Sequence, residues 1–129
     1  MHAYVDQLLA QVRLEHRTSI ELLVQWMRED MRRSIDKPRT LNQYAASAGV
    51  SVSHLSRCFS SNVGQTFRQE QQQIRMESAS RLLTDTTLKI SAISKLVGLP
   101  DPSQFTCDFR RKTGLTPGAY RLSHLVHHH

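Results

Sequence analysis

The chain has 129 residues, of which 39% are hydrophobic and 22% are charged, and this length suits one domain or two very small ones. No apolar run approaches the roughly 18 residues of a membrane helix, and five glycines and four prolines are few for an all-β protein rich in turns. The formal net charge is +6. A small basic domain most often binds an anionic partner, with nucleic acid ahead of a membrane surface.

The positive charge is concentrated in the second part of the chain. Residues 1–50 contain seven basic and six acidic residues, whereas residues 51–129 contain ten basic and five acidic residues. We therefore expect the C-terminal part to meet the anion. The two cysteines, Cys58 and Cys107, form no disulfide framework, and no signal peptide is visible, so we expect a cytoplasmic protein.

The first predicted elements are helices. Residues 1–18 show helical spacing and are interpreted as an N-terminal flank or linker helix. An apolar stripe then predicts a helix over about residues 19–34, and Pro38 prevents its continuation.

Two short helices follow, separated by a glycine turn. Thr40 is a good N-cap and Gly49 a good stop for the first, and the second runs from the N-cap Ser51 to Gly64. A short helix, a glycine-containing turn and a second short helix form the helix-turn-helix pattern.

A long helix and a second pair of short helices complete the chain. The segment from Thr66 to about Leu83 lacks glycine and proline, and its polar residues predict a largely solvated linker helix. A short helix then ends at Gly98. The next helix has Asp101 as N-cap and ends at Gly114, and a last short helix begins near residue 116.

The two pairs of short helices repeat each other with an offset of 50 residues, which is the signature of a duplicated unit. The fold class predicted is all-α, with helix-turn-helix subdomains at residues 19–65 and 86–123, a linker helix at 66–85 and a tail at 124–129 whose last histidines suggest a purification tag. The matched pairs are Ser51 with Asp101, Ser53 with Ser103, Leu55 with Phe105, Phe59 with Phe109, Gly64 with Gly114 and Thr66 with Thr116.

Residues 98–121 read GLPDPSQFTCDFRRKTGLTPGAYR. This run resembles the second-half signature of the AraC/XylS family of bacterial transcription regulators, approximately G-F-x-D-x-S-x-F-x-R-x-F-K-x-x-x-G-x-T-P-x-x-Y-R. The resemblance extends over about residues 20–122. It departs from the family pattern at Glu70, where an apolar residue is usual, at Ser94 for alanine, at Leu99 for phenylalanine, and at Cys107, where arginine is common.

The resemblance implies a sequence-specific DNA-binding transcription regulator, more often an activator that contacts RNA polymerase. It implies double-stranded DNA as partner, with no membrane, cofactor, metal or enzymatic activity. Many relatives carry an N-terminal sensing and dimerising domain, for which this length leaves no room, so the chain is either a C-terminal fragment or a stand-alone member. The irregular start at residues 1–3 and the histidine tail favour a fragment. The rival interpretation is a helical protein-interaction adaptor with a basic face.

The first recognition helix is expected to bury Leu55 and Phe59 and to turn its other face outward. Arg57 is the strongest candidate for base reading, since a guanidinium can donate two hydrogen bonds to guanine. A phosphate contact or a solvated arginine are the alternatives. The predicted DNA-binding residues of this helix are Ser51, Ser53, Ser56, Arg57 and Ser60.

The second recognition helix is expected to discriminate less strongly between DNA sequences than the first. Its basic run at residues 110–112 suits phosphate binding, with a plain solvated face as the alternative. Cys107 is interpreted as an ordinary exposed thiol rather than a redox switch. The predicted DNA-binding residues are Ser103, Thr106, Cys107, Arg110 and Arg111, and the two helices are expected to read successive major-groove segments about 10 base pairs apart.

Overall fold

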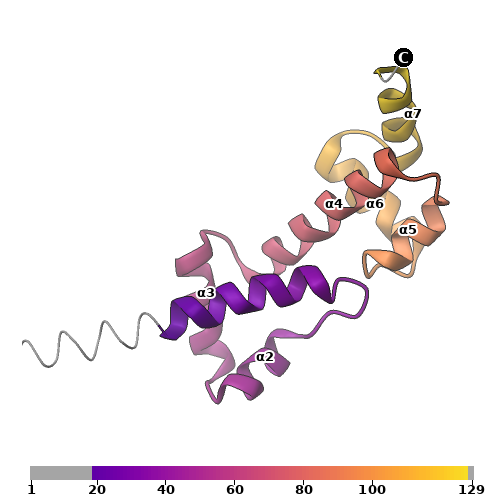
Figure 1. Cartoon of the computed structure of the whole chain (residues 1–129). Coiled ribbons are helices and arrows are strands. Elements are labelled where there is room, and N and C mark those ends of the chain that lie inside the picture. The colour runs from indigo at the N-terminus through magenta and orange to yellow at the C-terminus, as the bar shows by residue number, and fades with distance from the viewer. Residues whose placement is uncertain (1–18, 128–129) are drawn as a thin grey trace, which may run out of the picture. The chain divides into compact units, whose positions relative to one another are not determined.

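The computed structural model describes residues 19–127, which contain helices and no strand (Figure 1). This confirms the prediction of an all-α chain with two helix-turn-helix motifs. No helix among these residues is both long enough and apolar enough to cross a membrane. The helices are one over residues 19–33, α2 (Leu41–Ala48), α3 (Val52–Val63), α4 (Phe67–Asp85), α5 (Ile90–Leu96), α6 (Pro102–Thr113) and α7 (Pro117–His127).

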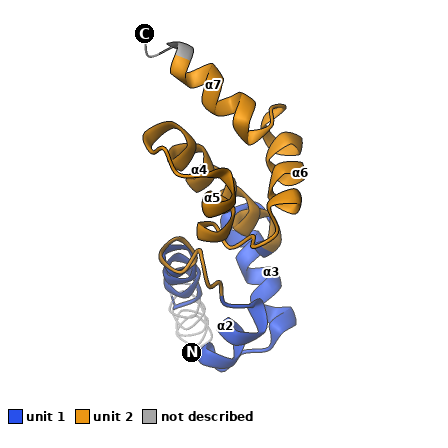
Figure 2. Ribbon diagram, turned by 90° about the vertical axis from the view of Figure 1, so that its right-hand side faces the viewer, with its two compact units in different colours: residues 1–30, 39–67 blue, residues 31–38, 68–129 orange. Residues whose placement is uncertain are grey.

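The described chain divides into two compact units (Figure 2). Unit 1 comprises residues 19–30 and 39–67, with α2 and α3. Unit 2 comprises residues 31–38 and 68–127, with α5, α6, α7 and all of α4 except Phe67. Each unit therefore contains one helix-turn-helix motif and its own buried side chains.

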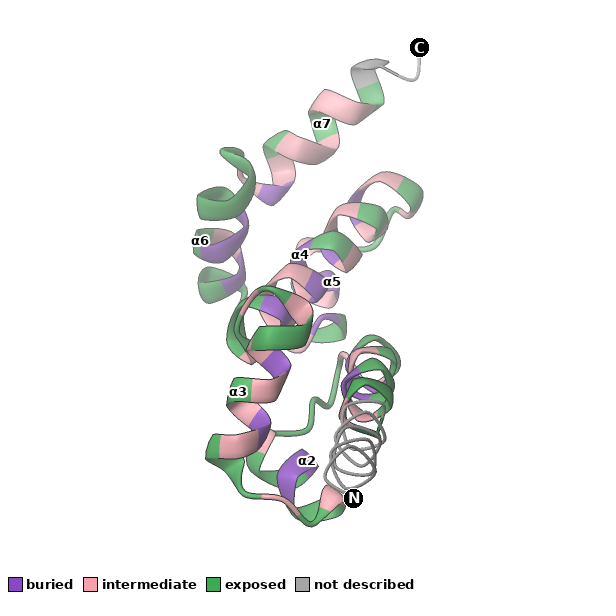
Figure 3. Cartoon of the chain, turned by 90° about the vertical axis from the view of Figure 1, so that its left-hand side faces the viewer, coloured by how far each residue is buried: buried purple, intermediate pink, exposed green. Residues whose placement is uncertain are grey.

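The core of unit 1 is built from aromatic and aliphatic side chains on one face of each helix. Leu55 and Phe59 of α3 are almost fully buried, as is Tyr44 of α2. Figure 3 shows buried positions, in purple, on both α2 and α3. The Phe67 ring meets Tyr44 and Phe59 edge-on, with ring centroids 5.9 and 5.6 Å apart. Such edge-to-face pairs stabilise a core beyond the area that they bury. The face of α3 that buries Leu55 and Phe59 is the face predicted to do so.

Local chemistry fixes the ends of α2. The Thr40 hydroxyl accepts from the backbone N–H of Gln43 at 3.1 Å, and the Gln43 side chain accepts from the Thr40 N–H at 2.9 Å. This reciprocal capping box satisfies two N–H groups that the first helical turn leaves open. Gly49 ends the helix with a φ of 70°, a backbone angle that glycine adopts at little cost. Both predicted caps of α2 are confirmed.

Unit 2 has a continuous hydrophobic core. Phe105 and Phe109 of α6 are fully buried, and Tyr120 of α7 packs edge-on against Phe109 at 5.2 Å. Because α4 contributes three side chains to this core, it is a structural part of unit 2. The buried cluster consists of Met76, Ala79, Leu83, Ile93, Val97, Phe105 and Phe109.

The turn between α5 and α6 is the tightest point of unit 2. Gly98 has a φ of 85°, and a Cβ atom added there would overlap the backbone oxygen of Ile35. Beside it the buried Ser94 hydroxyl donates to the carbonyl of Leu99. Asp101 then caps α6 by accepting from the Ser103 N–H at 3.0 Å. The predicted cap at Asp101 is confirmed, and the departure at Ser94 is accommodated by a satisfied hydroxyl.

Two features differ from the sequence-based expectations. The polar start of α4 is not uniformly solvated, because Glu70 is only 3% exposed and lies 3.9 Å from the guanidinium of Arg32. The last helix extends further than expected: α7 continues to His127, past residue 123 and into the predicted tail, because the sequence from residue 119 onward contains no glycine or proline to end it.

Candidate nucleic-acid interface

The helix α3 is held so that one face is buried and the other is open. Its start is fixed by the Ser51 hydroxyl, which accepts from the His54 N–H at 3.1 Å, and its end by Gly64 with a φ of 87°. With Leu55 and Phe59 buried, the 100° step of an α-helix turns Ser53 and Arg57 away from the core. Both are exposed.

The predicted site residues of α3 therefore fall into two groups. Ser53 and Arg57 stand in solvent, whereas Ser56 and Ser60 are half-buried at the edges of the exposed face. Ser51 is exposed but its hydroxyl is engaged as the cap. The residue with the longest reach and the only charge in this set is Arg57.

The helix α6 repeats this arrangement in unit 2. It has 12 residues, as α3 has, and begins 50 residues later. Phe105 and Phe109 are buried with ring centroids 5.8 Å apart. The predicted residues Ser103, Cys107, Arg110 and Arg111 are exposed, and Thr106 is half-buried.

The end of α6 is strongly basic. Arg110, Arg111 and Lys112 occupy its last turn, where cations also suit the negative end of the helix dipole. Arg111 lies 3.8 Å from Asp108, but its side chain is 80% exposed. An ion pair at that exposure is weak, so Arg111 keeps its charge available to an anion.

The inner face of α6 carries a buried carboxylate, Asp108. Asp108 is 8% exposed and accepts from the Gln104 amide at 2.9 Å. Burial lowers the pKa of Arg75, while the nearby charge of Asp108 acts in the opposite direction. The Arg75 Nε atom is buried. This electrostatic interaction between Arg75 of α4 and Asp108 of α6 was not identified from the sequence, because the two residues are 33 positions apart and are brought near each other only by folding.

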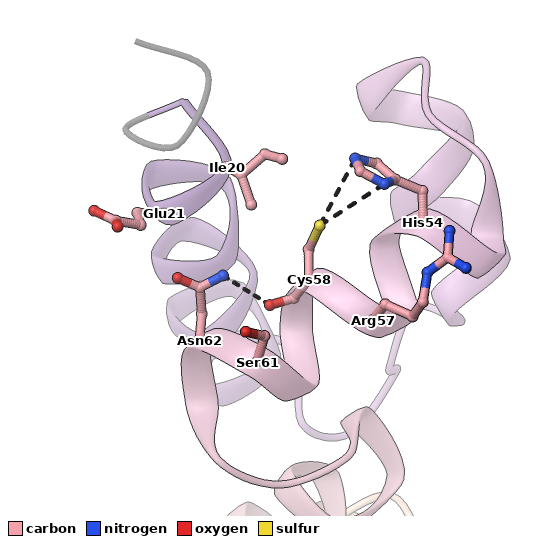
Figure 4. A pocket seen from close by; sticks show the side chains of 7 residues that line it. All are labelled: Ile20, Glu21, His54, Arg57, Cys58, Ser61 and Asn62. Carbon is pink, nitrogen blue, oxygen red and sulfur yellow. Dashed lines mark hydrogen bonds between the residues drawn. The ribbon is translucent and has the colours of Figure 1, made fainter. Parts of the chain in front are cut away.

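A histidine and a cysteine meet on α3. His54 is half-buried, and its ring nitrogens lie 3.7 and 3.9 Å from the Sγ atom of Cys58, one turn along α3 (Figure 4). The spacing of four residues was a signal for this contact, since residues i and i+4 share a helix face. In the part of the chain that the structure describes, no group of three or more acidic, histidine or cysteine side chains is arranged to hold a metal ion.

Comparison with known proteins agrees with this geometry. Residues 44–123 match the family described as the helix-turn-helix domain, of AraC type. The transcriptional activator NphR of Rhodococcus sp is 37% identical over 89 residues, which cover 69% of this chain and 26% of that protein. The chain spans less than half the length of the curated relatives that it matches.

Solved structures show the same fold. The C-terminal domain of AraT, a response regulator from Geobacillus stearothermophilus, is 30% identical with a TM-score of 0.74, and the match covers 78% of this chain and 84% of that one. The DNA-binding domain of AdpA, a global transcriptional factor solved in complex with a target DNA, is 25% identical with a TM-score of 0.73, covering 84% of this chain and 94% of that one. The chain contains two helix-turn-helix motifs, its residues 44–123 match the family, and its relatives share the fold. It therefore belongs to the AraC family of helix-turn-helix domains.

Proposed function

We propose that this domain binds double-stranded DNA sequence-specifically as part of a transcription regulator, with α3 and α6 as its two recognition helices. The observation that carries the proposal is the repeated placement of the two helices. Each buries a hydrophobic stripe against its own unit and exposes a polar face that contains arginine. An α-helix with such a face fits the major groove, where each base pair presents a distinct hydrogen-bonding pattern.

We assign the two helices different roles in DNA binding. In α3, Arg57 with Ser53 reads base edges, and Ser56 and Ser60 border the contact. In α6, Arg110 and Arg111 bind phosphates, while Ser103, Thr106 and Cys107 offer short side chains that discriminate weakly between bases. The backbone N–H groups at the starts of both helices, near Ser51 and Asp101, add phosphate contacts.

The regulatory role is proposed from the relatives. NphR is named a transcriptional activator, and AdpA was solved with its target DNA. We extend activation to this protein, with RNA polymerase as the second partner and the cytoplasm as the compartment, and we assign it no enzymatic activity.

The experiment is a binding series with DNA selected from a random pool. Because a protein that neutralises phosphates releases counterions, the logarithm of the binding constant should fall linearly with the logarithm of salt concentration. Enrichment of one sequence motif together with this slope supports the proposal. A binder of acidic proteins, which is the rival function, would enrich no motif.

Footprinting of the bound protein tests the use of both helices. A monomer with two recognition helices in successive major-groove segments protects one continuous, asymmetric site of about two turns, roughly 20 base pairs. No inverted repeat is needed, because the exposed faces of α3 and α6 differ in sequence. Protection of a single turn would show that one of the two helices does not enter the groove.

A further inference from the structure

The recognition helix of unit 1 carries a thiol and an imidazole that face each other across one helical turn. The Sγ atom of Cys58 lies 3.7 Å from Nε2 and 3.9 Å from Nδ1 of His54 (Figure 4). A thiol gains nucleophilicity when a neighbouring base takes its proton or a neighbouring imidazolium stabilises the thiolate. In the structure the imidazole of His54 already lies beside the Cys58 thiol.

The pair lines a pocket large enough for a small molecule. The pocket has a volume of about 540 Å³, within the range of sites that hold small ligands. Its lining residues are Ile20, Glu21, His54, Arg57, Cys58, Ser61 and Asn62. Cys58 is half-buried and lines the pocket, so its sulfur is reached through it. The lining carries one charge of each sign, Arg57 beside Cys58 on α3 and Glu21 on the helix over residues 19–33.

We propose that Cys58 is a modification site for low-molecular-weight disulfides such as glutathione disulfide, activated by His54. His54 accepts the proton of the Cys58 thiol, and the resulting thiolate attacks one sulfur of the disulfide. The new bond joins Cys58 to that sulfur as the S–S bond of the reagent breaks. The other sulfur leaves as a thiolate and takes the proton from the imidazolium. The Cys58 sulfur is oxidised and the departing sulfur is reduced.

The modification is expected to change DNA binding, because Arg57 lines the same pocket. A mixed disulfide places new bulk beside that side chain. The carboxylates of a bound glutathione pair with the Arg57 guanidinium, and they repel the phosphates of DNA. We infer that the modified protein binds its site more weakly and that a reducing thiol restores binding. This consequence rests on the proposed function, whereas the modification itself does not.

The second cysteine supplies a matched control. Cys107 lies on the equivalent helix α6 and is more exposed than Cys58, but the position one turn before it is Ser103 rather than histidine. Each single-cysteine variant, Cys107→Ser and Cys58→Ser, is treated with glutathione disulfide, and the rate of adduct formation is followed by intact mass. The proposal requires Cys58 to react roughly tenfold faster than Cys107 despite its lower exposure.

Two substitutions test the activation. In the Cys107→Ser protein, both His54→Ala and His54→Gln should bring the rate at Cys58 down to that of Cys107, and circular dichroism verifies that the variants fold. DNA affinity is measured for each protein before and after modification, and again after dithiothreitol. A Cys58 that reacts no faster than Cys107, or a rate that His54 does not affect, overturns the proposal. If the unmodified chain binds no DNA, the proposed function fails, while the rates still decide the modification.

Discussion

The Tyr44 hydroxyl donates a hydrogen bond of 2.7 Å to Oδ2 of the buried Asp30, and the Arg39 guanidinium donates to the same oxygen at 3.0 Å. One carboxylate thus ties the helix over residues 19–33 to α2 and to the segment before it. We predict that Tyr44→Phe lowers the free energy of unfolding by about 1.5–3 kcal/mol, because a hydrogen bond to a charged group is lost in the core. Urea unfolding measures the change. Tyr120→Phe is the control, since packing of that ring on Phe109 does not need the hydroxyl.

The same contact predicts a dependence on alkaline pH. Burial, followed by the hydrogen bond and the charge of Asp30, raises the pKa of Tyr44 well above the ordinary tyrosine value. The raised pKa means that the folded state favours the protonated phenol. This contribution to stability is complete below the unfolded-state pKa of about 10 and is lost as the pH rises above it. Urea unfolding at increasing alkaline pH should therefore show a steeper loss in the natural chain than in Tyr44→Phe, and equal slopes would contradict the assignment.

Gly98 should be far less replaceable than Gly49. Both residues have positive φ, so alanine at either position carries a backbone penalty of about 1 kcal/mol. Only at Gly98 does the new methyl group also overlap backbone, namely the Ile35 oxygen, whereas nothing lies within 4 Å at Gly49. We predict that Gly98→Ala destabilises the protein by at least about 2 kcal/mol more than Gly49→Ala. Thermal unfolding of the two variants compares them directly, and similar midpoints would refute the predicted overlap.

Arg57→Ala should weaken binding to the selected DNA site by roughly 1–3 kcal/mol and relax the preference at one base pair. Arg57→Lys is the informative companion, because lysine keeps the charge and loses the paired guanidinium hydrogen bonds. Competition with single-base variants of the site measures both effects. Equal weakening on every sequence would assign Arg57 to a phosphate.

Arg110→Gln and Arg111→Gln should each weaken binding to all DNA and lower the salt slope by about one. The lysine variants should restore the slope, because a phosphate contact of this kind depends on charge more than on geometry. Binding titrations at several salt concentrations supply the slopes. A slope that neither glutamine variant changes would leave the basic end of α6 as solvated surface.

The parts of the fold that were predictable are those governed by neighbours in sequence. The caps at Thr40, Ser51 and Asp101 and the stripe of Phe105 with Phe109 depend on contacts within a few residues, so the pattern alone indicates them. The exposed face of each recognition helix was predicted for the same reason, since it follows from the local stripe of buried residues. The DNA contacts of those faces stay predictions.

The unpredicted features depend on residues that folding brings together. Asp30 and Tyr44 are 14 positions apart, and no local signal indicates that one buried carboxylate will receive both a phenol and a guanidinium. Glu70 belongs to a polar run, yet tertiary packing buries it beside Arg32. The His54–Cys58 contact is different, because residues four positions apart on a helix share a face and the spacing alone indicates that the two side chains can meet.

Arg121 of α7 donates hydrogen bonds to the carbonyls of Leu83 at 3.0 Å and Thr86 at 3.2 Å, at the end of α4. Those two carbonyls therefore receive their donor from a residue 35 to 38 positions later in the chain. During synthesis on the ribosome, unit 2 cannot complete its packing until residue 121 has been made. Unit 1 is complete in sequence at Phe67, so the nascent protein gains its first recognition helix well before its second.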